Sequence, residues 1–111
     1  SDAARFDLKQ GEGGLVDLEF LLQFLVLRDA GAHPALLAPR DTPGLLRASG
    51  DAGVLQDAET LRRAHAALLD AGLRCTLDSR KRLLPREQVP EDARCAISAA
   101  VRAQGLRFDE S

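Results

Sequence analysis

The feature that most constrains the fold is an apolar repeat between Gly14 and Ala30, GLVDLEFLLQFLVLRDA. Phe20, Phe24 and Leu27 add apolar side chains outside the main stripe, so this segment is apolar nearly all round. Such helices are normally buried on more than one side. We therefore expect a helix that is either central to a bundle or faces a partner. The stripe has the i, i+3, i+4, i+7 spacing of a helix and consists of Leu15, Leu18, Leu21, Leu22, Leu25 and Val26.

The composition of the remaining chain favours the same fold class. The 111 residues include no Trp, Tyr or Met and only four Phe, so Leu, Ala and Val must build the core. That composition favours helices over sheets, which are richer in aromatic and β-branched residues. We predict an all-α fold, a small up-and-down helical bundle of the four-helix type over residues 14–111, after an extended junction at 1–13.

Proline and glycine interrupt the chain after the first helix. Residues 31–43 hold several such breakers and allow at most a short helical turn at 35–37. Thr42 followed by Pro43 predicts an N-cap, with proline at the first helical position. The helix that begins there should be brief and end near Ser49.

Two further helices are expected toward the C-terminus. Asp57 can cap the first of them, which we expect to continue through Gly72. Residues 79–90 are predicted to form a polar loop, and the acidic pair that follows begins a final helix to about Gln104, with Gly105 as its stop. The inner stripe of the third helix is predicted to be Leu61, Ala64, Leu68 and Ala71.

The charge pattern argues against polyanion and membrane partners. The 15 basic and 17 acidic residues are spread along the chain and give a net charge of −2, so no field attracts a nucleic acid. The most apolar stretch, 20–27, is far shorter than the ~20 residues that a membrane span requires. The sequence also begins without a signal-peptide pattern, and we expect a cytoplasmic location.

Neither the cysteines nor the histidines indicate a metal site. Cys75 and Cys95 lack a CxxC spacing, lie in segments predicted to be helical, and are expected to be buried thiols. His33 precedes a proline, and His65 has no second ligand at i+4. We expect both histidines to have structural or surface roles.

A cluster of glycines lies directly before the apolar helix. Gly11, Gly13 and Gly14 follow Lys9, but no Gly-Lys-Ser/Thr ending is present, and Val16 stands where a dinucleotide fingerprint would have its third glycine. A helix N-terminus still offers free amide groups to an anion, with Lys9 as a counter-charge. A tight packing turn is favoured over a nucleotide contact, and both remain open.

Polar side chains on the apolar helix form a second candidate. Asp17 and Glu19 point about 200° apart on a helix, so they cannot share one metal ion without distortion. Glu19 and Gln23, at i and i+4, share one face. That face is either a solvent-facing strip or a set of functional groups at the edge of a pocket.

The segment from Asp7 to Arg28 resembles the bifunctional glutamine-synthetase adenylyltransferase/deadenylylating enzyme family. That family carries the pattern Lys-x-Gly-x-Gly-Gly-hydrophobic-x-Asp/Glu-hydrophobic-Glu-Phe-x-x-Gln after each of its two nucleotidyltransferase domains. Glu12 departs from it, since arginine is frequent there. The copy associated with adenylyl transfer is the more similar one, and residues 58–74 loosely resemble a later helix of the family. The matching residues are Lys9, Gly11, Gly13, Gly14, Leu15, Asp17, Leu18, Glu19, Phe20 and Gln23.

The resemblance implies a parent enzyme that transfers AMP from ATP to a tyrosine of glutamine synthetase, with Mg²⁺ and ATP as its cofactors. The family binds metal through an Asp-x-Asp pair in its catalytic domain, and this chain contains no such pair. We therefore expect a fragment, similar to a nucleotidyltransferase substrate-binding domain, that holds no metal or cofactor and is inactive alone.

The resemblance also implies partners and a set of residues beside the active site. The expected partners are the catalytic domain, glutamine synthetase and the PII signalling protein. Lys9 is implied as a phosphate or carboxylate contact, the glycines as places of close backbone approach, and the carboxylates as orienting groups. The alternative is a protein-interaction bundle that docks glutamine synthetase or PII without a catalytic role. The implied active-site-adjacent residues are Lys9, Gly11, Gly13, Gly14, Asp17, Glu19 and Gln23.

Overall fold

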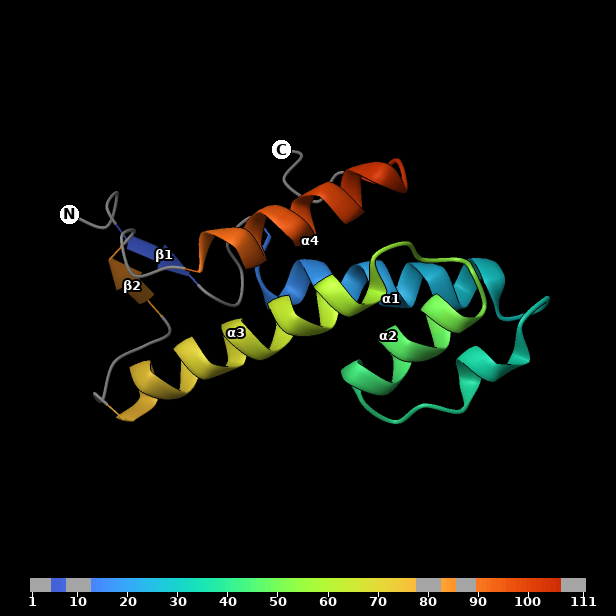
Figure 1. Ribbon diagram of the computed structural model, residues 1–111, viewed down its shortest axis with the longest axis horizontal. Helices are drawn as coiled ribbons and strands as arrows, with labels where there is room; N and C mark the ends of the chain where they lie inside the picture. The colour runs from blue at the N-terminus through green and yellow to red at the C-terminus, as the bar shows by residue number, and fades with distance from the viewer. Residues whose placement is uncertain (1–4, 8–12, 78–82, 86–89, 107–111) are drawn as a thin grey trace.

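The computed structural model describes residues 5–7, 13–77, 83–85 and 90–106, and shows a helical bundle (Figure 1). The predicted all-α bundle is confirmed. Helix α1 contacts α2, α3 and α4, and α3 in turn packs against α2 and α4. The helices are α1 (Leu15–Asp29), the short 3-10 helix η2 (Pro34–Leu37), α2 (Thr42–Asp51), α3 (Ala58–Leu77) and α4 (Glu91–Ala103).

The core lies where α1, α3 and α4 meet, with α2 closing one side. Five leucines of the predicted α1 stripe are buried, and Val26 is half-buried. All four residues of the predicted α3 stripe are buried as well, which confirms the helical periodicity. The core residues from the other helices are Leu46 of α2 and Ala93, Ile97 and Val101 of α4.

The apolar side chains of α1 outside its main stripe are partly packed in the bundle and partly exposed on its surface. Phe24 packs against the core, and the Arg28 guanidinium lies 5.1 Å from the centroid of its ring. Phe20 is 52% exposed and Leu27 is 87% exposed. Helix α1 is therefore central, as expected, and also presents apolar side chains outward. No helix within the described residues is long and apolar enough to span a membrane.

The predicted cap of α2 was wrong by one residue. Asp41, rather than Thr42, is the N-cap, and its Oδ1 accepts a hydrogen bond of 2.8 Å from the Gly44 amide. Pro43 then lies in the first turn, where a missing N–H leaves no helical hydrogen bond unmade. The helix continues to Asp51, beyond the predicted end at Ser49.

The later helices largely follow the prediction. Helix α3 continues through Gly72 to Leu77, and α4 ends at Ala103 before Gly105, which has a φ of +78°. The prediction of buried thiols was wrong for Cys95, which is exposed because it lies on the outer side of α4. The side chain of Cys75 lies outside the described residues.

The predicted polar loop at 79–90 contains a short strand. Strand β2 (Leu83–Pro85) pairs antiparallel with β1 (Arg5–Asp7), with Phe6 opposite Leu84. The proline is tolerated because it is the last residue of an edge strand. The remainder of that loop up to Pro90 lies outside the described residues. The pairing connects the predicted junction at 1–13 to the segment that precedes α4.

Candidate functional site

The glycine turn before α1 is closed by α4. Gly13 has a φ of +74°, a conformation that side-chain-bearing residues rarely adopt. A Cβ at this position would lie 2.8 Å from Ser98 Oγ and still closer to the carbonyl oxygen of Arg94. Both neighbours belong to α4. Position 13 therefore requires glycine both for its backbone conformation and for its packing. Among the described residues, those of α4 lie closest to it.

Asp17 holds this turn from within the helix. Its Oδ2 accepts a hydrogen bond of 2.8 Å from the Gly13 amide. Gly14 is the N-cap of α1 and has no side chain that could accept a bond from the first helical amides. Asp17 acts on the other side of the cap, because the amide that it accepts from belongs to Gly13, the residue before the N-cap. The negative charge also complements the positive end of the helix dipole. Asp17 thus has a structural role at the start of α1.

Glu19 and Gln23 lie on a different face of α1. Both are exposed, and both line a groove of about 290 Å³ between α1 and the start of α2. The opposite wall contributes a cation, a carboxylate and a hydroxyl from consecutive residues. The groove is therefore polar on both sides and open to solvent. Its other lining residues are Leu22, Pro39, Arg40, Asp41, Thr42 and Leu45.

The pKa of a buried histidine is affected by two carboxylates that line this groove. His65 of α3 is 8% exposed, and burial lowers the pKa of its imidazole. The carboxylates of Glu19 and Asp41 act in the opposite direction but do not outweigh the loss of hydration. His65 is therefore neutral at pH 7. This matches the expected structural role, and the sequence alone gave no sign that it would lie near Glu19.

The structure thus separates the predicted site residues. Gly13, Gly14 and Asp17 form the turn against α4, whereas Glu19 and Gln23 face the groove beside α2. Lys9 and Gly11 lie outside the described residues, so their predicted roles stay predictions. Within the described part of the chain, no group of three or more His, Cys, Asp or Glu residues could hold a metal ion.

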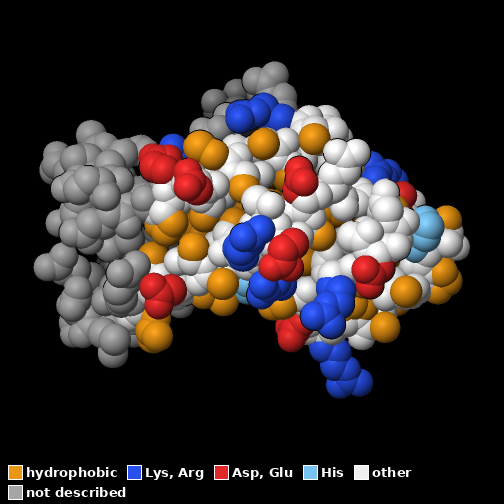
Figure 2. Space-filling view, viewed as in Figure 1, with side chains coloured by type: hydrophobic (Ala, Val, Ile, Leu, Met, Phe, Trp, Pro, Cys, Tyr) orange, Lys and Arg blue, Asp and Glu red, His pale blue; other side chains and the backbone are white. Residues whose placement is uncertain are grey.

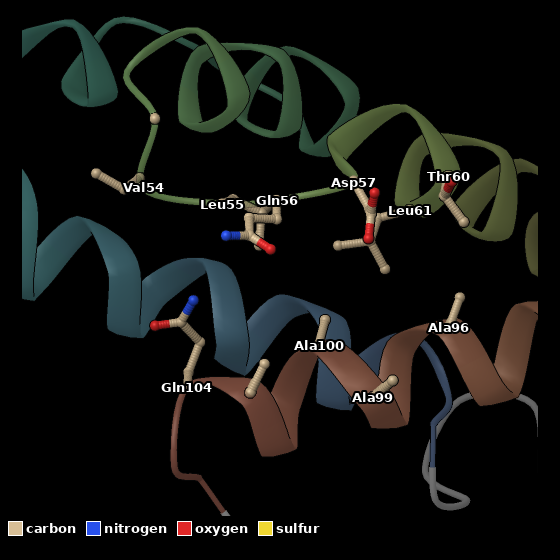
Figure 3. A pocket seen from close by; sticks show the side chains of 12 residues that line it. Val54, Leu55, Gln56, Asp57, Thr60, Leu61, Ala96, Ala99, Ala100 and Gln104 are labelled. Atoms are coloured by element: carbon tan, nitrogen blue, oxygen red, sulfur yellow. The ribbon is translucent and has the colours of Figure 1, made fainter.

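A larger groove between α3 and α4 was not predicted from the sequence. It has a volume of about 580 Å³, and in Figure 3 Gln56 and Gln104 lie on its opposite walls while alanines of α4 line one side. A second groove of about 510 Å³ shares Thr60 and Ala96 with it. The only sequence signal was the row of alanines in α4, which also fits simple close packing. The larger groove is mainly apolar with Asp57 as its charged residue, whereas the second groove is lined by Arg63, Glu91 and Asp92 as well as by alanines.

Comparison with known proteins finds relatives of the chain that share one name. No protein-family model matches the chain. The chain is 59% identical over 110 residues to a protein of Stenotrophomonas maltophilia strain K279a. It is 53% identical over 110 residues to a protein of Xanthomonas axonopodis pv. citri, and 39% identical over 90 residues to one of Shewanella woodyi.

All three relatives are named bifunctional glutamine synthetase adenylyltransferase/adenylyl-removing enzyme. The chain is therefore a relative of one segment of these enzymes, and the resemblance expected from residues 7–28 is confirmed. The similarity to the first two covers 97% of the chain, more than the segments 7–28 and 58–74 on which the resemblance was based. The chain spans only 12% of the length of those two relatives.

Proposed function

We propose that this chain is a helical accessory domain of a glutamine synthetase adenylyltransferase. The observation that carries the proposal is the similarity over 97% of the chain to a segment that makes up 12% of bifunctional enzymes with that name. The absence of an Asp-x-Asp pair from the sequence supports an accessory role. The parent enzyme would transfer AMP from ATP to a tyrosine of glutamine synthetase.

In this proposal the chemistry belongs to a catalytic domain elsewhere in the parent. Mg²⁺ bound there would stabilise the charge on the phosphates during in-line displacement. The described residues of this chain supply the geometry around that centre. Gly13 and Asp17 fix the direction in which the chain enters α1, because the turn is locked against α4 and onto the helix.

Glu19 and Gln23 are the residues that we propose face the catalytic domain. They are exposed at a polar groove, and a carboxylate beside an amide can accept and donate hydrogen bonds to a neighbouring backbone or side chain. Lys9 and Gly11 precede them in the family motif and are proposed to act at the same junction. Positioning of this kind controls rate, since a shift of about 1 Å can lower turnover about 100-fold.

The test is an AMP-transfer assay with the 111-residue chain and with its parent enzyme. Each is incubated with glutamine synthetase, Mg²⁺ and labelled ATP, and label incorporated into glutamine synthetase is counted. We expect transfer by the parent and none by the chain alone. Turnover by the isolated chain above the protein-free background would contradict an accessory role. Full activity in a parent from which this segment is deleted would contradict it equally.

A second candidate is a protein-interaction bundle that docks glutamine synthetase or the PII protein without a catalytic role. The observation in its favour is the apolar surface of α1, where Leu27 is 87% exposed. Calorimetric titration of the chain with each purified partner tests it. Leu27→Ser should abolish binding, while Leu37→Ser, at another exposed leucine, should not. Equal effects of the two changes would count against α1 as the docking surface.

A further inference from the structure

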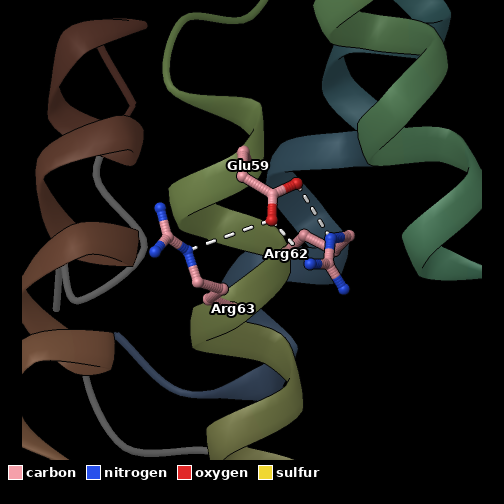
Figure 4. Close-up of polar contacts among 3 residues, drawn as sticks. All are labelled: Glu59, Arg62 and Arg63. Carbon is pink, nitrogen blue, oxygen red and sulfur yellow. Dashed lines mark hydrogen bonds and ion pairs between the residues drawn. The ribbon is translucent and has the colours of Figure 1, made fainter.

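A group of arginines gathers around one carboxylate on the outer side of α3. Glu59 accepts two hydrogen bonds from Arg62, from Nε at 2.9 Å and from Nη2 at 2.5 Å, and Arg63 Nε lies 4.0 Å from its Oε2 (Figure 4). In that view Arg62 extends toward α2, and Arg63 extends toward α4. Arg62 and Arg63, at i+3 and i+4, therefore lie on either side of Glu59 on one face of α3.

Arg47 adds a third positive charge from the neighbouring helix α2. It is near enough to contribute to the lowered pKa of Glu59, whose main cause is the hydrogen bond from Arg62. Within the described part of the chain, Arg47 itself has no hydrogen bond or ion pair. Glu59 is hydrogen-bonded to Arg62 and only 4.0 Å from Arg63, so Arg47 and Arg63 are the arginines that it compensates least. Glu91 and Asp92 of α4 line the same groove as Arg63, so the positive surface is strongest on the side that faces α2.

These charges are exposed. The side chain of Arg63 is 70% exposed, and that of Arg62 is 45% exposed. Figure 2 shows basic side chains gathered around acidic ones over the middle of this face. The chain as a whole carries a net charge of −2, so the positive charge of this surface is opposite in sign to that of the whole chain.

We propose that Arg47, Arg62 and Arg63 form a docking surface for an acidic segment of a partner protein. The planar guanidinium group pairs well with carboxylates through two parallel hydrogen bonds. Two carboxylates on the partner would match the two charges that Glu59 leaves uncompensated. A nucleic acid carries a continuous row of phosphates, whereas an acidic protein segment can place one carboxylate on either side of Glu59 and a neutral residue opposite it.

The test measures binding of a fluorescein-labelled peptide of alternating glutamate and glycine to the 111-residue chain, by fluorescence anisotropy at low salt. We expect Arg47→Glu to weaken binding about tenfold, because a charge reversal replaces an attraction by a repulsion. Arg102→Glu, the same change of net charge on α4, should alter the affinity less than about twofold. Equal losses in the two variants would reduce the effect to net charge and overturn the proposal.

A second pair of variants removes a carboxylate instead of an arginine. Glu59→Gln releases Arg62 and Arg63 and should tighten peptide binding a few-fold. Asp29→Asn is the control, because it releases Arg28 from a similar pair at the end of α1. Tightening by both variants alike, or no measurable binding by the unmodified chain, would contradict the proposal.

A single-stranded oligonucleotide of equal charge is the competitor that tests the class of partner. We expect it to bind more weakly than the peptide, and tighter binding would assign the surface to nucleic acid instead. The proposal does not depend on the adenylyltransferase assignment. Peptide binding and AMP transfer are separate measurements, so either can fail without the other.

Discussion

The start of α1 and its second turn carry residues of the same motif but meet opposite surroundings. At the start, Gly13 packs against α4 and its amide is bound by Asp17, so polar and steric requirements are met inside the domain. From the second turn onward, Glu19 and Gln23 are exposed at a polar groove. Residues of a single motif therefore differ in their surroundings. One part builds the bundle, and the other remains available to a neighbouring protein surface.

The substitution with the largest expected effect on stability is Gly13→Ala, which tests the contact between the turn and α4. The new methyl group would meet α4 while the backbone keeps a positive φ, and we expect a loss of about 3 kcal/mol in the free energy of unfolding. Urea titration followed by circular dichroism measures it. Gly53→Ala is the matched control, because Gly53 has a φ of +78° but open space around it. It should lose only about 1 kcal/mol. Equal losses would mean that contact with α4 does not constrain the turn.

A milder test compares the two carboxylates. Asp17→Ala removes the acceptor of the Gly13 amide and should lower the free energy of unfolding by about 1 kcal/mol. Glu19→Ala alters an exposed side chain and should change it by less than about 0.5 kcal/mol. The same urea titration serves both variants. A larger loss for Glu19 than for Asp17 would reverse the division that the structure indicates.

The stability of the domain should also fall in mild acid through His65. Its pKa is lowered in the folded state by burial, so between the folded pKa and the unfolded pKa the unfolded chain binds more protons than the folded one. Stability is therefore fully present above the unfolded pKa of about 6.5 and is lost as the pH falls from there toward the folded pKa. Thermal unfolding of the unmodified chain and of His65→Leu between pH 7.5 and 5 should show a smaller loss in the variant. An unchanged pH dependence would exclude His65 as its source.

The smallest effect concerns the pKa of that histidine. Glu19 raises it, so Glu19→Gln should shift the His65 titration, followed by NMR, to lower pH. Asp17→Asn lies on the other face of α1 and should leave the titration unchanged. A shift of equal size in both variants would show that the two faces are not electrostatically separate.

Much of the fold could be predicted because it follows from local periodicity. The buried leucines of α1 and the inner stripe of α3 occur at helical spacing, and every residue of the α3 stripe is buried. The cap of α2 was misplaced because Asp41 and Thr42 are adjacent and both are good cap residues. Strand β2 was missed because its pairing with residues 5–7 is distant in sequence and leaves no periodic signal.

The candidate site was less predictable for a related reason. The motif predicted which residues around the start of α1 lie beside an active site, but only the packing of α4 shows that Gly13 is sterically closed. The arginine surface depends on α2 lying beside α3, since Arg47 is separated from Arg62 and Arg63 by a turn and a loop. Contacts between elements of this kind cannot be derived from the spacing of residues in one helix.

The most direct test of the account is AMP transfer by the parent enzyme carrying Glu19→Ala together with Gln23→Ala. If this face supports a catalytic neighbour, the rate should fall about tenfold or more, while the unfolding temperature of the enzyme stays that of the unmodified protein. Gln56→Ala, at the separate groove between α3 and α4, should leave the rate unchanged. Transfer at the unmodified rate by the double variant would contradict the claim that this face of α1 serves the catalytic domain.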